Sequence, residues 1–193
     1  MSGILKVGGS ELINDNGGSG ALQWGTGVPT NTIIQIVQTA KTDKFTGAGN
    51  TSEQLITGYN CSITPHKTGS KILINYAFDT SANAANTARS YMERDIGGAG
   101  YAKLTGVHGD DPGGSLGDPS LSHAGTYGSF QAQRRAGMYL DSPSYTSGQT
   151  ITYRIGVQSE SSSRPVIVGS TERDSDGYHP RTASILILME VAQ

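Results

Sequence analysis

The segment 183–192 reads ASILILMEVA and decides the fold class of this chain. In a β-strand, alternate side chains point to opposite faces, so Leu186 and Leu188 line one face, and the other is lined by Ile185, Ile187, Met189 and Val191. Strands that are apolar on both faces are typical of parallel sheets covered by helices. No stretch of ten residues or more shows helical periodicity, so helices cannot supply the second cover. We therefore predict an all-β protein in which Leu186 and Leu188 lie in an interface between copies of the chain.

The composition excludes several classes of protein. The 193 residues carry a net charge of −2, only 16% are charged, and 27 are glycine. A nucleic-acid binder would show a clustered basic face, and the nearest approach to one is the pair Arg134-Arg135. Cys61 is the single cysteine, so no intrachain disulfide can form, and we expect its side chain to be buried. No apolar run of about 20 residues is present, and Met1–Val7 is too short for a signal peptide, so we expect no membrane insertion or export signal.

Short strands separated by turn residues follow one another from Thr32 onward. The clearest alternation lies in Lys71–Phe78 and Thr150–Gln158, where every second residue is a large apolar one. Gly97–Tyr127 is rich in glycine and is expected to be a long surface loop. About eight strands of this kind predict an antiparallel β-sandwich of the jelly-roll type. The expected strands are Ile33–Thr39, Gln54–Ile56, Cys61–Thr64, Lys71–Phe78, Arg89–Ile96, Ser129–Leu140, Thr150–Gln158, Pro165–Val168 and Ala183–Ala192.

Residues 1–30 differ from the head expected over residues 31–193. They contain very short apolar runs between glycine-rich stretches, too short to enclose a core of their own. Apolar side chains of this size are unfavourable in water, so the segment is expected to pair with neighbouring chains or to dock on a larger assembly. The residues expected to make this attachment are Leu5, Val7, Leu12, Ile13 and Trp24.

A family resemblance rests on motifs that occur in order along the chain. They are Thr32–Thr42, Ser62–Pro65, Ser70–Ile74, Leu140–Pro143, Thr152–Ile155 and Ile187–Val191, with Leu5-Lys6-Val7 at the amino end. Together they resemble small tail-fibre and virion-surface proteins of phages of aquatic bacteria. The resemblance implies an attachment segment followed by a homotrimeric jelly-roll head, similar to the tumour-necrosis-factor and complement globular-head group. It does not account for the acidic, glycine-rich loop at residues 106–119.

The sequence contains no motif that strongly supports a catalytic function. The serines and the four histidines lie in no nucleophile motif, and no glycine-rich loop follows a strand and precedes a helix. Asp110, Asp111 and Asp118 share one loop, which rarely fixes the geometry of a glycosidase pair. These aspartates and the segment Asp174–Gly177 are only fragments of calcium loops. We predict a protein that is not an enzyme and needs no cofactor or metal.

Binding is better supported, because nine tyrosines against three phenylalanines favour rings that stack on a ligand and also hydrogen-bond. The predicted function is adhesion to the host surface, glycan or protein, as a trimeric tail fibre of the virion, made in the host cytoplasm. Two alternatives stay open: a capsid decoration (cement) protein that clamps shell subunits, and a carbohydrate-binding lectin. The candidate receptor-binding residues are Tyr101, His108, Asp110, Asp111, Tyr127, Tyr145 and Tyr178.

Overall fold

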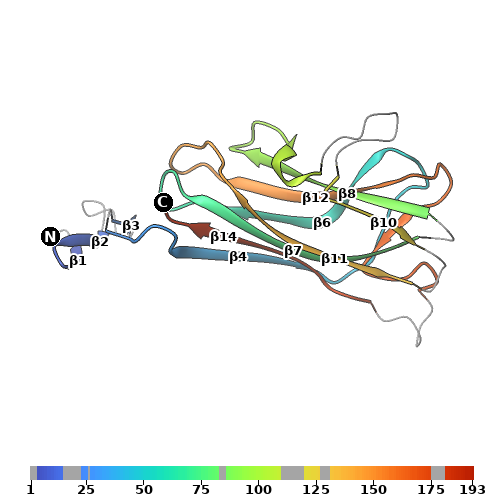
Figure 1. Cartoon of the computed structure of the whole chain (residues 1–193), viewed down its shortest axis with the longest axis horizontal. Helices are drawn as coiled ribbons and strands as arrows, with labels where there is room; N and C mark the ends of the chain where they lie inside the picture. The colour runs from blue at the N-terminus through green and yellow to red at the C-terminus, as the bar shows by residue number, and fades with distance from the viewer. Residues whose placement is uncertain are drawn as a thin grey trace.

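The structure, a computed structural model, describes residues 4–14, 23–25, 27–82, 86–109, 120–126, 131–174 and 181–193. It is an antiparallel all-β fold in which two sheets pack face to face (Figure 1). The strands of the head are β4 (Ile33–Lys41), β5 (Phe45–Thr46), β6 (Glu53–Ile63), β7 (Lys71–Ala82), β8 (Asn86–Ile96), β9 (Ala102–Lys103), β10 (Ser122–Thr126), β11 (Gln133–Asp141), β12 (Ile151–Ser159), β13 (Val166–Val168) and β14 (Ser184–Val191). A 3-10 turn, η1 (Thr105–Val107), follows β9.

One sheet has the order β4–β14–β7–β13–β5, and β11 pairs with the other edge of β7. The second sheet has the order β10–β8–β12–β6, and β9 adds a short strand next to β8. Strands that are neighbours in a sheet are mostly distant in the sequence, as in β4 and β14. The β-sandwich that we predicted is thus confirmed.

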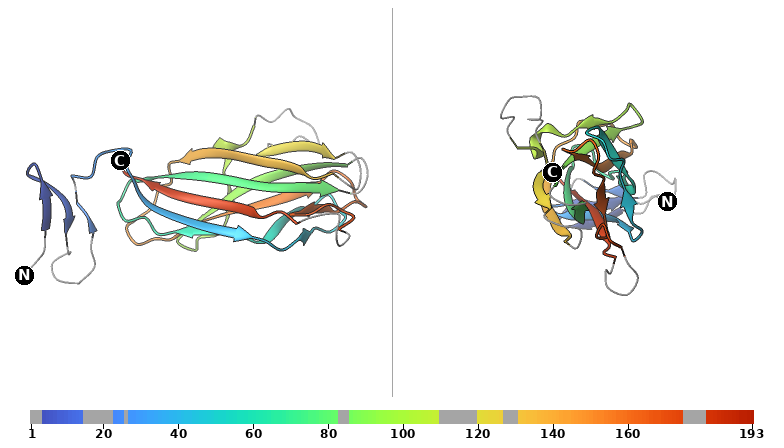
Figure 2. Two further views of the ribbon diagram at one scale, coloured as in Figure 1. Left: turned by 90° about the horizontal axis from the view of Figure 1, so that it is seen from below. Right: turned by 90° about the vertical axis from the view of Figure 1, so that its right-hand side faces the viewer.

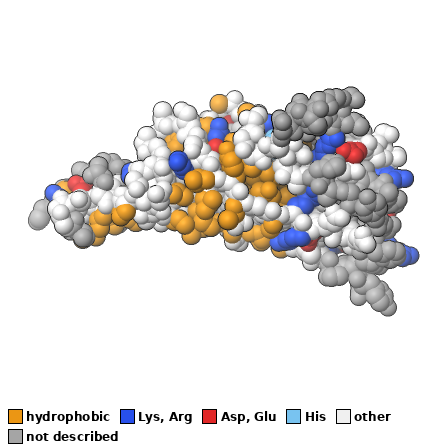
Figure 3. All heavy atoms as spheres, in the orientation of Figure 1, with side chains coloured by type: hydrophobic (Ala, Val, Ile, Leu, Met, Phe, Trp, Pro, Cys, Tyr) orange, Lys and Arg blue, Asp and Glu red, His pale blue; other side chains and the backbone are white. Residues whose placement is uncertain are grey.

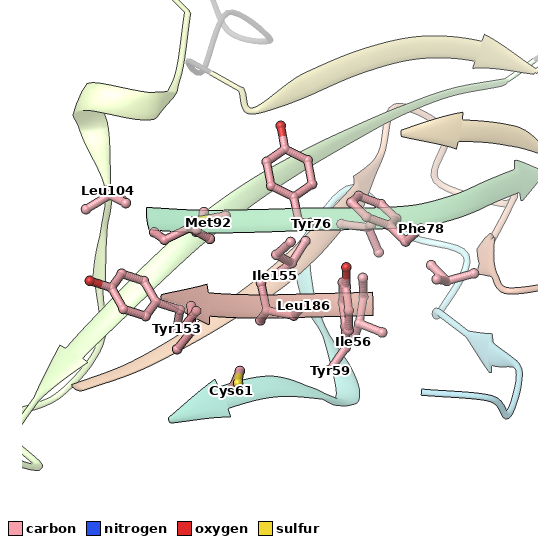
Figure 4. Close-up of a cluster of buried hydrophobic side chains, with 14 of the residues drawn as sticks. Ile56, Tyr59, Cys61, Tyr76, Phe78, Met92, Leu104, Tyr153, Ile155 and Leu186 are labelled. Atoms are coloured by element: carbon pink, nitrogen blue, oxygen red, sulfur yellow. The ribbon is translucent and has the colours of Figure 1, made fainter. Parts of the chain in front are cut away.

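The core lies between the two sheets and is built from the alternating strands. In β7 and β12 every second side chain is buried, which confirms the predicted inward faces. Tyr59 and Phe78 meet edge to face with ring centres 5.7 Å apart, and Cys61 is buried in the same core as expected (Figure 4). Burial raises the pKa of the Cys61 thiol, so the thiol stays protonated at neutral pH.

Polar residues also tie the two sheets together. Asp141 of β11 accepts hydrogen bonds from Arg94 of β8 at 2.6 and 2.8 Å and from the Tyr153 hydroxyl of β12 at 2.6 Å. Because β11 belongs to one sheet and β8 and β12 to the other, this buried carboxylate fixes their relative position. A buried charge needs such partners to be tolerated.

The role predicted for Leu186 and Leu188 is wrong. Both side chains are fully buried inside a single chain, facing the opposite sheet of the sandwich. The sequence shows that β14 is apolar on both faces, but not which face turns inward. The face left partly exposed carries Ile185, Ile187 and Met189.

Two other expectations also need correction. The segments Gln54–Ile56 and Cys61–Thr64 were predicted as separate strands around a turn, but they form one long strand, β6, with an irregularity at Gly58. The region Gly97–Tyr127, predicted to be one long loop, contains β9, η1 and β10.

The amino-terminal segment forms a small sheet of its own. Its strands are β1 (Ile4–Val7), β2 (Ser10–Asn14) and β3 (Gln23–Trp24), paired in the order β1–β2–β3. This sheet projects beyond the end of the head where the carboxyl terminus lies (Figure 2). Backbone hydrogen bonds from Asn31 to Ala192 and from Ala192 to Thr32 join the following segment to the head.

Candidate functional site

A pocket opens on the outer side of the sheet β10–β8–β12–β6. Its cavity measures about 300 Å³ and is formed by β6, β12 and the loop between β8 and β9. We call it the Tyr101 pocket. Its lining residues are Leu55, Ile56, Thr57, Gly58, Asn60, Tyr101 and Arg154.

The irregularity of β6 shapes one wall of this pocket. Arg154 pairs with Asn60, and two residues further along β12, Gly156 pairs with Leu55, so β6 has extra residues between these two points. Gly58 lies in this bulge with a φ of 77°, a left-handed conformation that favours glycine. The bulge leaves Thr57 and Gly58 exposed and turns Tyr59 into the core, where its hydroxyl donates to the carbonyl of Ile185 at 2.7 Å.

Arg154, which lines the pocket, is held by contacts with β8 and with the loop between β8 and β9. Its Nε donates to Glu93 Oε2 on β8 at 2.6 Å, and its guanidinium carbon lies 3.4 Å from the centre of the Tyr101 ring. Stacking of a guanidinium on an aromatic ring is favourable and orders both groups. Tyr101 nevertheless remains 38% exposed, so part of its ring is open to solvent.

A second pair of a cation and a ring lies on the same sheet. Lys103 lies 5.5 Å from the centre of the Tyr91 ring and forms an ion pair with Glu53. The Tyr91 ring covers Gly156, where a Cβ atom would lie 2.2 Å from the ring. Lys103 and Arg154 are thus each matched by a carboxylate on this surface.

His108 directly follows η1 and does not line the pocket. Its Nε2 accepts a hydrogen bond from the Met92 backbone N–H at 3.0 Å, so the ring is neutral with its proton on Nδ1. Burial, and then the positive charge of Lys103, hold the pKa of His108 below its usual value.

Of the other receptor-binding candidates, Tyr145 is half-buried and serves as an anchor. Its hydroxyl donates to the carbonyls of Lys67 and Ser70 at 2.7 and 3.3 Å. Asp110, Asp111, Tyr127 and Tyr178 lie outside the described residues. The structure therefore places Tyr101 at a pocket, joins His108 to the backbone of β8, and joins Tyr145 to the turn between β6 and β7.

Sequence reasoning missed Arg154, Glu93 and Asn60. Arg154 was recognised only as an outward residue of the strand Thr150–Gln158. Its partner in the pocket, Tyr101, is 53 positions away in the sequence, and no local pattern connects the two.

The opposite surface of the sandwich carries a largely apolar area, interrupted by Gln38 and Asn75, which we call the apolar face. It is the outer side of β4, β14, β7 and β11, where the register aligns side chains in rows across the four strands. Met138 is 69% exposed and Ile36 is 61% exposed. Figure 3 shows hydrophobic atoms gathered over this part of the head. The rows are Ile36–Met189–Leu73–Leu140, Gln38–Ile187–Asn75–Met138 and Ala40–Ile185–Ala77–Ala136.

The residues predicted to make the virion attachment lie in the amino-terminal sheet. The register aligns Leu5 with Ile13 and Ile13 with Trp24, so the three share one face across β1, β2 and β3. Leu5 is 55% exposed and Trp24 is 37% exposed. Leu12 and Ile13 are half-buried, and the Val7 side chain lies outside what the structure describes.

The described part of the chain contains neither a cluster of metal-ligating side chains nor a membrane-spanning helix. No group of three or more His, Cys, Asp or Glu side chains in these residues could hold a metal ion. Asp174, part of the calcium-loop fragment, is already engaged by Lys44, Arg181 and Ser170. No helix among the described residues is long and apolar enough to cross a membrane. No family model matches the chain, and no curated protein matches it in sequence.

Proposed function

We propose that this chain is a non-enzymatic structural protein of a phage virion, a homotrimeric tail fibre that adheres to the host surface. In this proposal the head, residues 31–193, is a jelly roll. The support for the jelly roll is the strand order β4–β14–β7–β11 in one sheet against β6–β12–β8–β10 in the other.

The apolar face is the observation that carries the proposal. Exposed apolar areas that extend over several strands mark protein–protein interfaces in soluble proteins. The three rows of this face contain no charged side chain; Lys71 and Arg134 lie beyond its two ends. Identical copies can bring such faces together without like-charge repulsion, so a second and third copy of this chain are the partners that fit. The interface that we propose is therefore formed by the outer side of this sheet and not by Leu186 and Leu188.

The molar mass in solution tests this assembly. We expect light scattering on the full chain to give the mass of three chains of 20.2 kDa each. The double variant Ile36→Lys and Met138→Lys places like charges on each copy of the face and is expected to give a folded monomer. Leu55→Lys, an exposed leucine on the other sheet, is the matched control and keeps the trimer. A monomeric parent chain, or a trimer that persists in the double variant, contradicts the proposal.

Capsid decoration is a second candidate function, and one observation favours it. The head follows the amino-terminal sheet directly, since Asn31 already bonds to Ala192 at the end of the head. No shaft of the kind expected in a long fibre separates the two parts within this chain. Gold-labelled antibody on intact particles distinguishes the functions: label at the tail supports the fibre, and label over the shell supports decoration.

A further inference from the structure

We propose that the Tyr101 pocket binds a neutral hexopyranose residue of a surface polysaccharide. This inference rests on the proposed adhesive function and names the ligand class of its contact with the host. It is carried by the lining of the pocket and by the charge balance of the surrounding sheet.

The polar groups of the pocket suit the hydroxyls of a sugar. Arg154 has five N–H donors, and within the described residues only its Nε donates to an acceptor of the protein. The ion pair with Glu93 fixes the guanidinium, and a fixed planar fork of donors recognises adjacent oxygen atoms without a large loss of entropy. The amide of Asn60, opposite Arg154 on β6, offers both a donor and an acceptor at the same site.

The apolar groups of the pocket suit the C–H face of a pyranose ring. Tyr101 and Leu55 both line the cavity, and each keeps about two fifths of its surface exposed. An aromatic ring that is held in place by a stacked guanidinium presents apolar area at a low entropic cost. The cavity volume of about 300 Å³ lies at the lower end of small-molecule pockets, which matches one sugar ring of a polymer.

The ion pairs at the pocket favour a neutral sugar over an acidic one. Arg154 is paired with Glu93, and Lys103 is paired with Glu53. A carboxylate ligand would therefore meet no excess positive charge and would approach two fixed carboxylates. Nucleic acid is disfavoured on the same ground, because its binding depends on unpaired basic residues.

Binding at one such pocket is expected to be weak, and an assembly of three copies strengthens it. Linked sites on one polymer gain overall affinity from a high effective concentration rather than from new contacts. The test therefore uses the full chain in its assembled state and polymeric probes.

Affinity electrophoresis in native gels containing mannan, dextran, galactan or polygalacturonate tests the proposal. We expect at least one neutral polymer to retard the full chain, and polygalacturonate to have little effect. Tyr101→Ala and Arg154→Lys should each weaken retardation about tenfold, equivalent to about 1.4 kcal/mol. Arg154→Lys keeps the charge but loses the planar fork. The matched control Arg134→Lys makes the same exchange on the opposite sheet and should change nothing.

Three results overturn the proposal: no neutral polymer retards the chain, only polygalacturonate does so, or retardation persists in both pocket variants. Circular dichroism and light scattering on each variant show that it is folded and assembled. Tyr101→Phe, which keeps the ring and the stacking, should retain most of the binding. A trimer that binds no neutral polymer rejects the pocket but leaves the proposed assembly intact, whereas a monomeric parent chain rejects the assembly.

Discussion

His108 makes the contact between η1 and β8 sensitive to pH. Its neutral Nε2 accepts the Met92 N–H, and protonation would convert this acceptor into a donor. Burial and the nearby Lys103 lower its pKa in the folded protein, while Glu53 acts weakly in the opposite direction. The unfolded chain therefore binds a proton at higher pH than the folded chain does. The contribution of neutral His108 to the free energy of unfolding is therefore complete above the ordinary histidine pKa of 6.5. It is lost as the pH falls below that value.

We expect His108→Gln to reduce the loss of unfolding free energy between pH 7 and pH 5, since glutamine can accept the same hydrogen bond without titrating. Urea denaturation at a series of pH values measures this loss. His66→Gln removes an exposed histidine and is the control. An unchanged pH dependence in His108→Gln would show that the Met92 contact does not depend on the neutral imidazole.

Glu190, a fully buried residue of β14, positions the turn between β6 and β7. Its carboxylate accepts hydrogen bonds from the backbone N–H groups of His66 and Lys67 and from the Ser70 hydroxyl, all at 2.8–2.9 Å. Hydrogen bonds to a buried charged group are stronger than those between neutral groups. The turn between β6 and β7 is thus fixed by a residue of β14, far away in the sequence. A glutamate within an apolar strand gave no hint of this role.

The two faces of β14 have different surroundings, so substitutions on them test folding and the proposed assembly separately. Leu186 packs in the core, whereas Ile187 lies on the apolar face. We expect Leu186→Ala to lower the unfolding free energy by about 2–5 kcal/mol, the usual cost of a cavity at a buried leucine. Ile187→Ala should have a smaller effect on the folding of one chain and should weaken association. Urea denaturation and light scattering of both variants give the two quantities. Leu186→Ala that stays fully stable but becomes monomeric would restore the interface first predicted for it.

Strands were predictable where every second residue is a large apolar one. β7 and β12 show this pattern, and their inward residues are those expected. The prediction failed at β14, since a strand with two apolar faces does not reveal which face meets the opposite sheet. It also failed at β6, because Gly58 and Asn60 are typical of a turn, and local sequence does not distinguish a turn from a bulge.

The candidate site was only partly predictable for a related reason. Tyr101 was selected because tyrosines in loops often bind ligands, and it does line a pocket. Its partner Arg154 belongs to a strand whose polar residues all looked equally exposed. The pocket exists because the β8–β9 loop folds back over β12, and such a long-range contact leaves no periodic signal in the sequence.

The whole molecule consists of a head with a complete core and a small amino-terminal sheet outside that core. The core cluster contains no residue before Val37 among the described residues. Val28 is buried, and Asn31 and Thr32 bond to Ala192, so the junction belongs to the head. The sheet β1–β2–β3 instead presents an apolar row that includes Leu5 and Trp24.

We therefore expect deletion of residues 1–27 to change Tm by less than about 3 °C, because it removes little buried surface from the head. The truncated chain should keep the molar mass of the full chain but fail to join particles that lack this protein. In the full chain, the double variant Leu5→Ser and Trp24→Ser should give the same loss of incorporation, measured by immunoblotting of purified particles. Lys6→Ser, an exposed polar exchange on the same strand as Leu5, is the control and should incorporate normally. Normal incorporation of the truncated chain would assign virion attachment to the head instead, and loss of folding on truncation would make the small sheet an integral part of the fold.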